Sequence, residues 1–239
     1  MKIGIIGFGK FGKFLAEKLG SQFSVKVFDK NVDSGKWAAG LAQVAQSDFV
    51  ILAVPLESYE KVLIGIKPSL NKKSVLVDVC SVKQQPVRII KSILPDQPLV
   101  ATHPLFGPES AAESIRGHTL VLCPDVSDAV PLKKLEQLAM FLGMKVKKMS
   151  AVEHDKEIAT VQGLTFFIAR ALKDLSLNEQ TVTTPSFKKL LSLAELEKHH
   201  SDELFYTIQA GNEQTKEIRK KFIEHCQELD LSIAKGLMD

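Results

Sequence analysis

Short apolar runs alternate with segments of helical spacing through the first 150 residues of the chain. The early runs are apolar on both faces, as buried strands of a parallel sheet are, and they cover Lys2–Ile6, Val25–Phe28, Phe49–Pro55, Ser74–Cys80 and Leu99–Ala101. Helices are predicted after the first strand and over Ser58–Ile66, Gln85–Leu94 and Pro131–Leu142, the last between two later strands, Thr119–Cys123 and Val146–Met149. This alternation predicts an α/β fold with a Rossmann-like, doubly wound and mostly parallel sheet.

The pattern changes near Ser150, beyond which no strand is evident. Apolar residues then recur with helical spacing, for example at Ile158, Val161 and Leu164, and a long final helix is predicted over Gln209–Leu231. We therefore expect a nucleotide-binding domain over residues 1–150 and a smaller, all-helical domain over residues 151–239. Because the junction has no stretch rich in Gly, Ser or Pro, the two domains are expected to pack together.

The composition is that of a soluble globular protein, with 45% apolar and 25% charged residues in a chain of 239. A net charge of +3, with Lys and Arg spread along the chain, does not indicate nucleic-acid binding. The three cysteines are odd in number and widely spaced, so they indicate neither a disulfide scaffold nor a metal site. Without a signal-peptide pattern or an apolar run of about 20 residues, we expect a cytoplasmic protein with no membrane contact.

A glycine-rich turn, Gly7–Gly12 (GFGKFG), joins the first strand to the first helix. In dinucleotide-binding folds the first glycine permits the tight turn, the second lets the backbone approach a pyrophosphate, and the third lets the helix pack close to the strand. The N–H groups at the start of the helix then face the phosphates. The motif alone is a weak signal, but strand, glycines and helix occur here in the required order.

The second strand ends at Asp29, at the distance from the glycines where an acidic residue contacts the adenosine ribose. A carboxylate there accepts a hydrogen bond from a free 2′-hydroxyl and repels a 2′-phosphate, so it favours NAD. Lys30 can pair with a phosphate, which leaves NADP open, and an aspartate that only caps a turn is the alternative interpretation. The residues predicted to bind the cofactor are Gly7, Phe8, Gly9, Lys10, Phe11, Gly12, Asp29, Val54 and Pro55.

A histidine and a serine follow two successive strands of the predicted sheet. His103 comes just after the Leu99–Ala101 run, with Pro104 restricting the chain behind it, and Ser81 follows the preceding strand. The imidazole is expected at the edge of the sheet where open α/β folds bind their ligands. A neutral imidazole can accept a proton near neutral pH. A histidine that only hydrogen-bonds within a tight turn is the alternative.

Three further motifs accompany the glycine-rich turn: Asp78–Lys83 (DVCSVK), Thr102–Glu109 (THPLFGPE), and Glu153–Asp155 (EHD) followed by Gln162. With these motifs the chain resembles the prephenate and arogenate dehydrogenase family over nearly its whole length, and it is closer to the arogenate branch. The resemblance implies that the first domain binds NAD or NADP and that the helical domain completes the active site and forms a homodimer. It also implies a reaction of tyrosine biosynthesis, in which the ring C4 hydroxyl of arogenate or prephenate is oxidised while the C1 carboxylate leaves as CO₂.

The resemblance also implies roles for individual residues. His103 matches the catalytic histidine that takes the proton of the C4 hydroxyl as hydride leaves for the nicotinamide, and Ser81 matches the serine that orients this hydroxyl or the histidine. Glu109 matches an acid near the gate of the site, with a carboxylate at a helix start as an equal alternative. The Glu153–Asp155 segment is expected to cap a helix and act as a hinge at the domain junction, without a part in catalysis.

Two departures from the family concern the substrate. Prephenate-using members carry a histidine where Phe166 stands here, and an arginine at a position near Leu196. A dicarboxylate still needs cationic partners, although each candidate cation can instead be an ordinary surface residue. The residues predicted to bind substrate are Ser81, His103, Glu109, Gln162, Arg170, Lys188 and Lys189, with His199 and His200 as further candidates.

Two other functions remain open from the sequence. The missing histidine and arginine are compatible with an NAD-binding regulatory relative that lacks turnover, although such a chain has no physical reason to keep both His103 and Ser81. Another small Rossmann dehydrogenase, such as a 3-hydroxy-acid or imine-reducing enzyme, accounts for the glycines but leaves Thr102–Glu109 unexplained.

Overall fold

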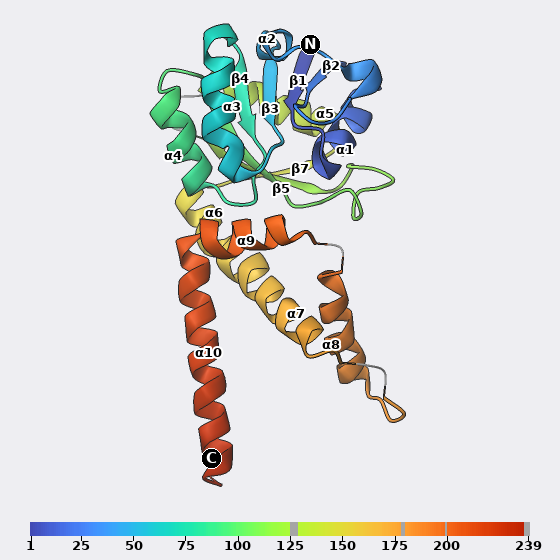
Figure 1. Cartoon of the computed structure of the whole chain (residues 1–239), viewed down its shortest axis with the longest axis vertical. Helices are drawn as coiled ribbons and strands as arrows, with labels where there is room; N and C mark the ends of the chain where they lie inside the picture. Colours follow the sequence, from blue (N-terminus) through green and yellow to red (C-terminus); the bar gives the residue numbers. More distant parts are fainter. Residues whose placement is uncertain (125–128, 178–179, 199, 237–239) are drawn as a thin grey trace. The chain divides into compact units, whose positions relative to one another are not determined.

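The computed structural model describes residues 1–124, 129–177, 180–198 and 200–236 of the chain. It divides into two compact units, Met1–His154 and Asp155–Asp239. In Figure 1 the chain is coloured from blue at the N-terminus to red at the C-terminus, so the units follow one another along the colour bar. The expected domain boundary, residue 150, directly precedes helix α6 (Ala151–Ile158), which continues from the first unit into the second.

The first unit is built on a seven-stranded sheet with the order β2-β1-β3-β4-β5-β6-β7. Neighbouring strands are parallel except for β5 and β6, which are antiparallel. The strands are β1 (Lys2–Ile6), β2 (Ser24–Phe28), β3 (Phe49–Leu52), β4 (Val75–Asp78), β5 (Leu99–Pro104), β6 (Thr119–Pro124) and β7 (Lys145–Lys148). The strand order reverses direction at β1, and a reversal of this kind marks where open α/β sheets bind ligands.

Helices cover both faces of this sheet, as Figure 1 shows. Successive residues of a strand point to opposite faces, so Ile3 and Ile5 join a buried cluster with α1 and α5, whereas Val50 and Leu52 join a second cluster with α2, α3 and α4. The helices are α1 (Lys10–Leu19), α2 (Leu41–Ala45), α3 (Tyr59–Ile66), α4 (Gln84–Ile93) and α5 (Ala129–Phe141), with short 3₁₀ turns at Gly35–Trp37, Leu56–Ser58 and Lys67–Ser69. These two layers of helices confirm the predicted doubly wound, mostly parallel fold.

Two features of the first unit differ from the prediction. Strand β5 continues through Pro104, so His103 lies inside the strand instead of just after it, because Thr102 to Pro104 pair with β6. Helix α2 was not predicted, since its five residues are too few to show helical periodicity. The other strands and helices are present with their ends shifted by a few residues.

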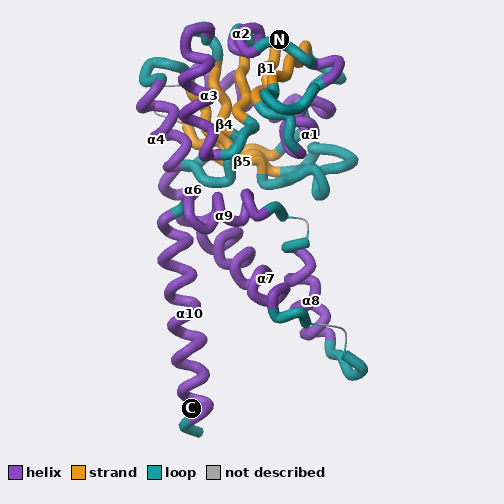
Figure 2. Tube along the Cα trace, viewed as in Figure 1, coloured by secondary structure: helices purple, strands orange, loops and turns teal. Residues whose placement is uncertain are grey.

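The second unit consists of helices and the loops between them, without a strand among its described residues (Figure 2). It contains a π-helical segment (Ala159–Leu164) that follows α6, then α7 (Thr165–Asp174), α8 (Pro185–Leu196), α9 (Asp202–Gly211) and α10 (Glu213–Ala234). Helix α7 packs against α8, and α10 packs against the π-helical segment and α9. Within the described part of the chain, no helix combines the length and the apolar character needed to cross a membrane.

The prediction of one continuous final helix over Gln209–Leu231 is wrong, because the helical structure breaks at Asn212. Its backbone is extended, with φ −123° and ψ 109°, and its side-chain oxygen accepts a hydrogen bond from the N–H of Gln214 at 3.0 Å. The side-chain amide also donates to the carbonyl of Asp155 at 2.7 Å. An asparagine in this conformation is a strong helix N-cap, so it ends α9 and starts α10.

Candidate active site

The glycine-rich turn between β1 and α1 has a backbone that tolerates only glycine at two positions. Gly7 has a φ of 106°, and a Cβ there would overlap the carbonyl of Ala53. A Cβ on Gly12 would overlap the carbonyl of Gly7. Gly9, in contrast, faces open space at the start of α1, where the first N–H groups of a helix have no intrahelical partner. This arrangement fits the close approach of a pyrophosphate.

Asp29 ties the glycine-rich turn to the end of β2. Its carboxylate accepts hydrogen bonds from the backbone N–H groups of Phe8 at 2.7 Å, Asn31 at 2.8 Å and Val32 at 3.0 Å. Burial by itself raises the pKa of Asp29, but these three hydrogen bonds outweigh it and the net pKa lies below its ordinary value. Asp29 therefore does cap a turn, and it does so as an ionised carboxylate next to the glycines.

The remaining residues predicted to bind the cofactor surround this turn. The rings of Phe8 and Phe11 pack on the buried core of the first unit, so their backbone groups are the part available to a ligand. Val54 and Pro55 follow β3 and are half-buried, and Val54 lies directly beside Gly7. Lys10 is exposed at the first position of α1.

The carboxyl ends of β4 and β5 lie side by side. Asp78, the last residue of β4, pairs with Ala101 of β5, so the loop that carries Ser81 and the strand residues up to His103 meet at one edge of the sheet. Ser81 is half-buried. In the part of the chain that the structure describes, no hydrogen bond joins Ser81 to His103. The register thus brings the two segments together, while a direct pairing of the two side chains stays a prediction.

His103 is buried, with 3% of its surface exposed, and its imidazole contacts a second imidazole. Nδ1 of His103 lies 2.9 Å from Nε2 of His154, and the two rings meet edge to face with centroids 5.1 Å apart. Among the described residues, Nδ1 is the ring nitrogen of His103 that has a hydrogen-bond partner. Burial first, then the neighbouring His154 and Lys83, lower the pKa of His103 well below its ordinary value. His103 is therefore a neutral imidazole at neutral pH, as a general base must be.

The role of the Glu153–Asp155 segment is more specific than the sequence indicated. Glu153 caps α6, because its carboxylate accepts from the N–H and hydroxyl of Ser150 at 2.8 Å, and the Ser150 hydroxyl accepts from the N–H of Glu153 at 3.1 Å. These bonds hold the pKa of Glu153 below its ordinary value. His154 comes next, fully buried, and contacts the candidate base. The expected capping is present, and the contact between His154 and His103 is an addition to it.

A buried polar network lies beneath the loop that carries Ser81. Lys83 and Asp78 are both fully buried and form an ion pair, and the Lys83 ammonium also donates to the carbonyl of Thr102 at 2.5 Å. Asp78 accepts a hydrogen bond from the Tyr59 hydroxyl at 2.7 Å and from the N–H of Cys80 at 2.9 Å. The Thr102 hydroxyl donates to the carbonyl of Asp78 at 2.7 Å. The network therefore joins α3, β4, β5 and both ends of the serine loop.

The same network sets the protonation of two neighbouring groups. Burial, followed by the charge of Asp78, raises the pKa of Tyr59 well above its ordinary value and the pKa of Cys80 to about 12. Tyr59 is thus a permanent hydrogen-bond donor to Asp78, and Cys80 stays a neutral thiol. Cys80, Cys123 and Cys226 form no disulfide, and no group of three or more His, Cys, Asp or Glu side chains within the described residues is placed to hold a metal ion.

Glu109 lies in an exposed turn after β5. Residues 108–111 form this turn without a helix, so the alternative interpretation of Glu109 as a helix-start carboxylate is wrong. The turn is fixed next to α1, because the Lys18 ammonium donates to the carbonyls of Ala112 at 2.5 Å and Glu113 at 3.1 Å. A role of Glu109 at the gate of the site stays a prediction.

In the second unit, Gln162 lies in the π-helical segment and keeps an unsatisfied acceptor. Its Oε1 atom is buried and has no hydrogen-bond partner among the described residues. π-Helical turns are rare and frequently occur at functional sites. Two contacts hold this turn: Gln209 donates to the carbonyl of Gly163 at 2.7 Å, and the Thr215 side chain lies where a Cβ of Gly163 would be. An unpaired buried amide oxygen is what a ligand donor would satisfy.

Arg170 is engaged within the second unit, which makes it a poor candidate for a substrate carboxylate. Its Nε donates to the buried Glu197 at 2.8 Å and its Nη1 lies 2.9 Å from Asp202. Its guanidinium also stacks over the ring of Phe205, 4.3 Å from the centroid. On the other side of Glu197, Nδ1 of His200 lies 3.2 Å from the carboxylate, and its ring stacks on Phe166 with centroids 4.2 Å apart.

Lys188 and Lys189 differ from Arg170 because their ammonium groups are exposed on α8. No side-chain partner of either lysine occurs among the described residues. Leu196, near the position where prephenate-using members carry an arginine, is exposed at the end of α8. His199 lies outside the described residues. The two lysines are therefore the predicted substrate cations that remain available.

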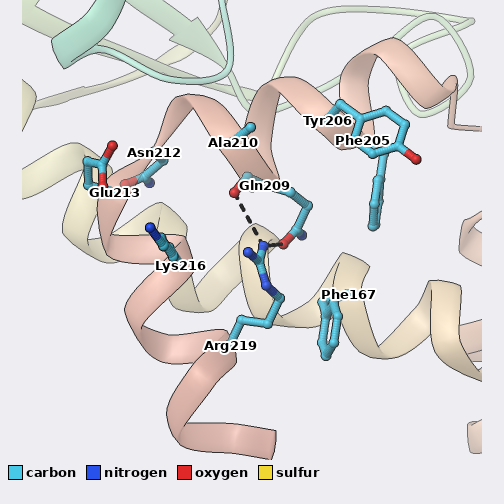
Figure 3. A pocket seen from close by; sticks show the side chains of 9 residues that line it. All are labelled: Phe167, Phe205, Tyr206, Gln209, Ala210, Asn212, Glu213, Lys216 and Arg219. Atoms are coloured by element: carbon cyan, nitrogen blue, oxygen red, sulfur yellow. Dashed lines mark hydrogen bonds between the residues drawn. The ribbon is translucent and has the colours of Figure 1, made fainter.

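The second unit also has a pocket of about 470 Å³, shown in Figure 3. Aromatic and cationic side chains line it, including Phe167, Tyr206 and Arg219. Nη1 of Arg219 donates to the side-chain oxygen of Gln209 at 2.7 Å, as the dashed lines of Figure 3 show. None of the residues predicted to bind substrate lines this pocket.

Comparison with known proteins identifies the family of the chain. The model of the prephenate dehydrogenase nucleotide-binding domain matches residues 25–148, which is more than half of the chain. Arogenate dehydrogenase 1, chloroplastic, of Arabidopsis thaliana is 31% identical over 240 residues, covering 93% of this chain and 37% of the relative. A probable arogenate/prephenate dehydrogenase of Methanocaldococcus jannaschii is 26% identical, covering 91% of this chain and 48% of the relative. The chain thus spans only part of the length of these relatives.

Solved structures share the fold at lower identity. Prephenate dehydrogenase of Aquifex aeolicus, crystallised with hydroxyphenyl propionate and NAD⁺, superposes with a TM-score of 0.78 at 22% identity, covering 99% of this chain and 91% of that one. Arogenate dehydrogenase of Synechocystis superposes with a TM-score of 0.75 at 19% identity, covering 99% of this chain and 93% of that one.

Proposed function

Because the chain belongs to the prephenate dehydrogenase family, we propose that it oxidatively decarboxylates arogenate to tyrosine or prephenate to 4-hydroxyphenylpyruvate, with hydride transfer to NAD⁺ or NADP⁺. The observation that carries this proposal is the buried, neutral imidazole of His103 at the carboxyl end of β5. A regulatory relative without turnover has no need of a base placed there, and a different small dehydrogenase leaves the Thr102–Glu109 motif unexplained.

The first unit supplies the residues that would hold the dinucleotide. The open space at Gly9 fits a pyrophosphate at the start of α1, and Gly7 and Gly12 keep the turn free of side chains. Asp29 offers an ionised carboxylate beside the turn, which favours the free ribose hydroxyls of NAD over the 2′-phosphate of NADP. When bound, the nicotinamide supplies the hydride acceptor.

His103 would take the proton of the ring C4 hydroxyl, while the C4 hydrogen leaves with its electron pair as hydride. The bond to the C1 carboxylate breaks in the same oxidation, and CO₂ leaves as the ring becomes aromatic. Loss of CO₂ makes the reaction effectively irreversible, so the protein contributes mainly a base and correct positioning. Ser81, on the neighbouring loop, would orient the hydroxyl.

The substrate carboxylates need cations, and Lys188 and Lys189 are the predicted ones that remain without side-chain partners in the described structure. Gln162 adds a buried amide oxygen that an ammonium group can satisfy. Arogenate carries such an ammonium on its side chain and prephenate does not. We therefore favour arogenate over prephenate.

A steady-state comparison of both substrates with both cofactors tests these choices. We expect the highest kcat/KM with arogenate and NAD⁺, because of Gln162 and Asp29 respectively. Equal use of NADP⁺ would contradict the assignment of Asp29, and a preference for prephenate would contradict that of Gln162. A folded protein that binds NAD⁺ and turns over neither substrate would favour the regulatory alternative.

We propose further that the protein forms a homodimer through its helical unit. Many large apolar side chains of this unit are exposed, among them Tyr206 on α9 and Ile223, Leu229 and Ile233 on α10. Helix α8 buries none of its residues. Exposed apolar surface on this scale is typical of an association site, and fewer than a hundred residues give a small helical core on their own.

Light scattering at micromolar concentration tests the dimer. A mass of twice 26.4 kDa is expected, and substituting Ile223 and Leu229 by Glu should shift it toward the monomer because each new carboxylate would have to be buried. A monomeric wild-type protein would rule this proposal out.

A further inference from the structure

Two buried imidazoles, those of His103 on β5 and His154 on α6, share a hydrogen bond. His103 and His154 are 3% and 1% exposed, and 2.9 Å separates Nδ1 of the first from Nε2 of the second. An N···N hydrogen bond holds one proton, so one imidazole donates and the other accepts. A further proton on His103 would place a cation in a buried site where the Lys83 ammonium already acts on this ring.

The direction of this hydrogen bond decides whether His103 can act as a base. If Nδ1 of His103 carries the proton and His154 accepts it, Nε2 of His103 has a free lone pair and can take a proton. If His154 donates instead, Nε2 of His103 carries the hydrogen and the ring has no basic nitrogen left.

We propose that His154 is a positioning residue that accepts the Nδ1 proton of His103, fixing the tautomer in which Nε2 is the basic nitrogen. The catalytic part of this inference rests on the proposed function, whereas the tautomer does not. His154 thereby takes the place that a buried carboxylate has beside the histidine of a serine-hydrolase triad. Unlike a carboxylate, a neutral imidazole orients the base without adding a negative charge.

The start of α6 is built to hold His154 in this position. The reciprocal hydrogen bonds between Ser150 and Glu153 fix the first turn of the helix directly before His154. Met149 and Ala151, on either side of Ser150, pack on a small buried cluster of Ala101, Val121 and Cys123 from β5 and β6. The helix start is therefore attached to the same strand that carries His103.

The groups facing the pair are consistent with an uncharged pair of imidazoles. Lys83 is the cation that acts on His103, and its own charge is balanced by Asp78. The Lys83 ammonium disfavours protonation of His103. One proton between the rings and one on the remaining nitrogen of His154 complete a neutral pair.

Imidazole nitrogen NMR on ¹⁵N-histidine-labelled protein tests the tautomer without any substrate. The His103 signals are assigned by their loss in His103→Asn, and His225→Leu, at an exposed site of α10, is the matched control. We expect Nδ1 of His103 protonated and Nε2 unprotonated at pH 7.5 in the wild type. The opposite tautomer in the wild type would overturn the proposal, whether or not the protein turns over either ring substrate.

Variants of His154 then separate positioning from stability. His154→Leu removes the acceptor at similar volume, and we expect kcat to fall on the order of 10²-fold, at the low end for loss of a base, with KM and the Kd for NAD⁺ nearly unchanged. His154→Gln keeps an acceptor oxygen and should recover most of kcat and the Nδ1–H tautomer. Equal activity of the Leu and Gln variants, or a parallel loss of NAD⁺ affinity, would show a merely structural histidine.

Discussion

His103→Asn is expected to lower kcat by about 10²–10⁴-fold, the range typical for removal of a general base. Asparagine has no group that can take a proton, yet its amide can still donate to Nε2 of His154 in place of the imidazole Nδ1. The Kd for NAD⁺ should stay within a factor of two, because the glycine-rich turn and Asp29 do not contact His103 in the described hydrogen-bond network.

Single-turnover kinetics and NAD⁺ titration of the same variant measure these two quantities. His225→Asn is the control, since His225 is exposed and pairs only locally with Glu228 at 3.0 Å. If kcat and NAD⁺ affinity fell together, His103 would be a structural histidine of β5, and the proposed base would be lost.

The lowered pKa of His103 also sets the expected pH dependence of the reaction. Because burial and the neighbouring His154 and Lys83 lower the pKa of His103 below its ordinary value of about 6.5, the neutral form persists as the pH falls below 6.5. The free energy of unfolding is therefore highest above pH 6.5 and decreases below it, because the unfolded chain then binds a proton at His103 that the folded chain does not. We expect kcat to be constant from pH 6.5 to 8 and to fall only at a pH below 6.5. An acid limb above pH 7 would contradict a depressed pKa.

Lys83→Met is expected to be the most destabilising single change, because it leaves the Asp78 carboxylate buried without its cation. Breaking a buried pair from one side costs about 3–5 kcal/mol in the free energy of unfolding, and for a chain of this size that lowers Tm by roughly 6–20 °C. The Tyr59 hydroxyl and the Cys80 N–H still donate to Asp78, but two neutral donors do not replace a charge.

The double variant Lys83→Met with Asp78→Asn provides the control. Removing both charges removes the unpaired carboxylate, so the double variant should melt above the single variant although it carries one more substitution. Thermal unfolding monitored by circular dichroism measures all three proteins. If the double variant melted lower than Lys83→Met, the two charges would not be coupled, and Lys83 would stabilise the protein through other contacts, such as its bond to the Thr102 carbonyl.

The fold and family were predictable from the sequence because their signals are local. The strand, glycines and helix of Lys2–Leu19 follow one another without interruption, and the buried strands show as short apolar runs. Strand β5 was longer than predicted, since polar Thr102 and His103 conceal a strand that pairing with β6 completes. The break at Asn212 was missed because an asparagine N-cap within a charged helical pattern resembles an ordinary surface residue.

The contacts that shape the site were not predictable, because they join residues far apart in the chain. His103 and His154 are 51 residues apart and meet only because α6 starts against β5 and β6. Lys83 belongs to a sequence motif, but its burial was not predictable because a lysine is usually exposed. It is buried with Asp78 and Tyr59 because α3 packs against β4. In the same way, Arg170 is separated by 27 or more residues from Glu197 and Asp202, its partners in the fold, so nothing in the sequence indicates that its charge is paired.

We propose that one base, His103, drives a coupled oxidation and decarboxylation. Simultaneous measurement of NADH by absorbance and of CO₂ from arogenate labelled at the C1 carboxylate tests it most directly. We predict that the two products appear in equal amounts and at equal rates with the wild type, and that both are lost together in His103→Asn. Cofactor binding without either product, or NADH formed without CO₂, would contradict the account.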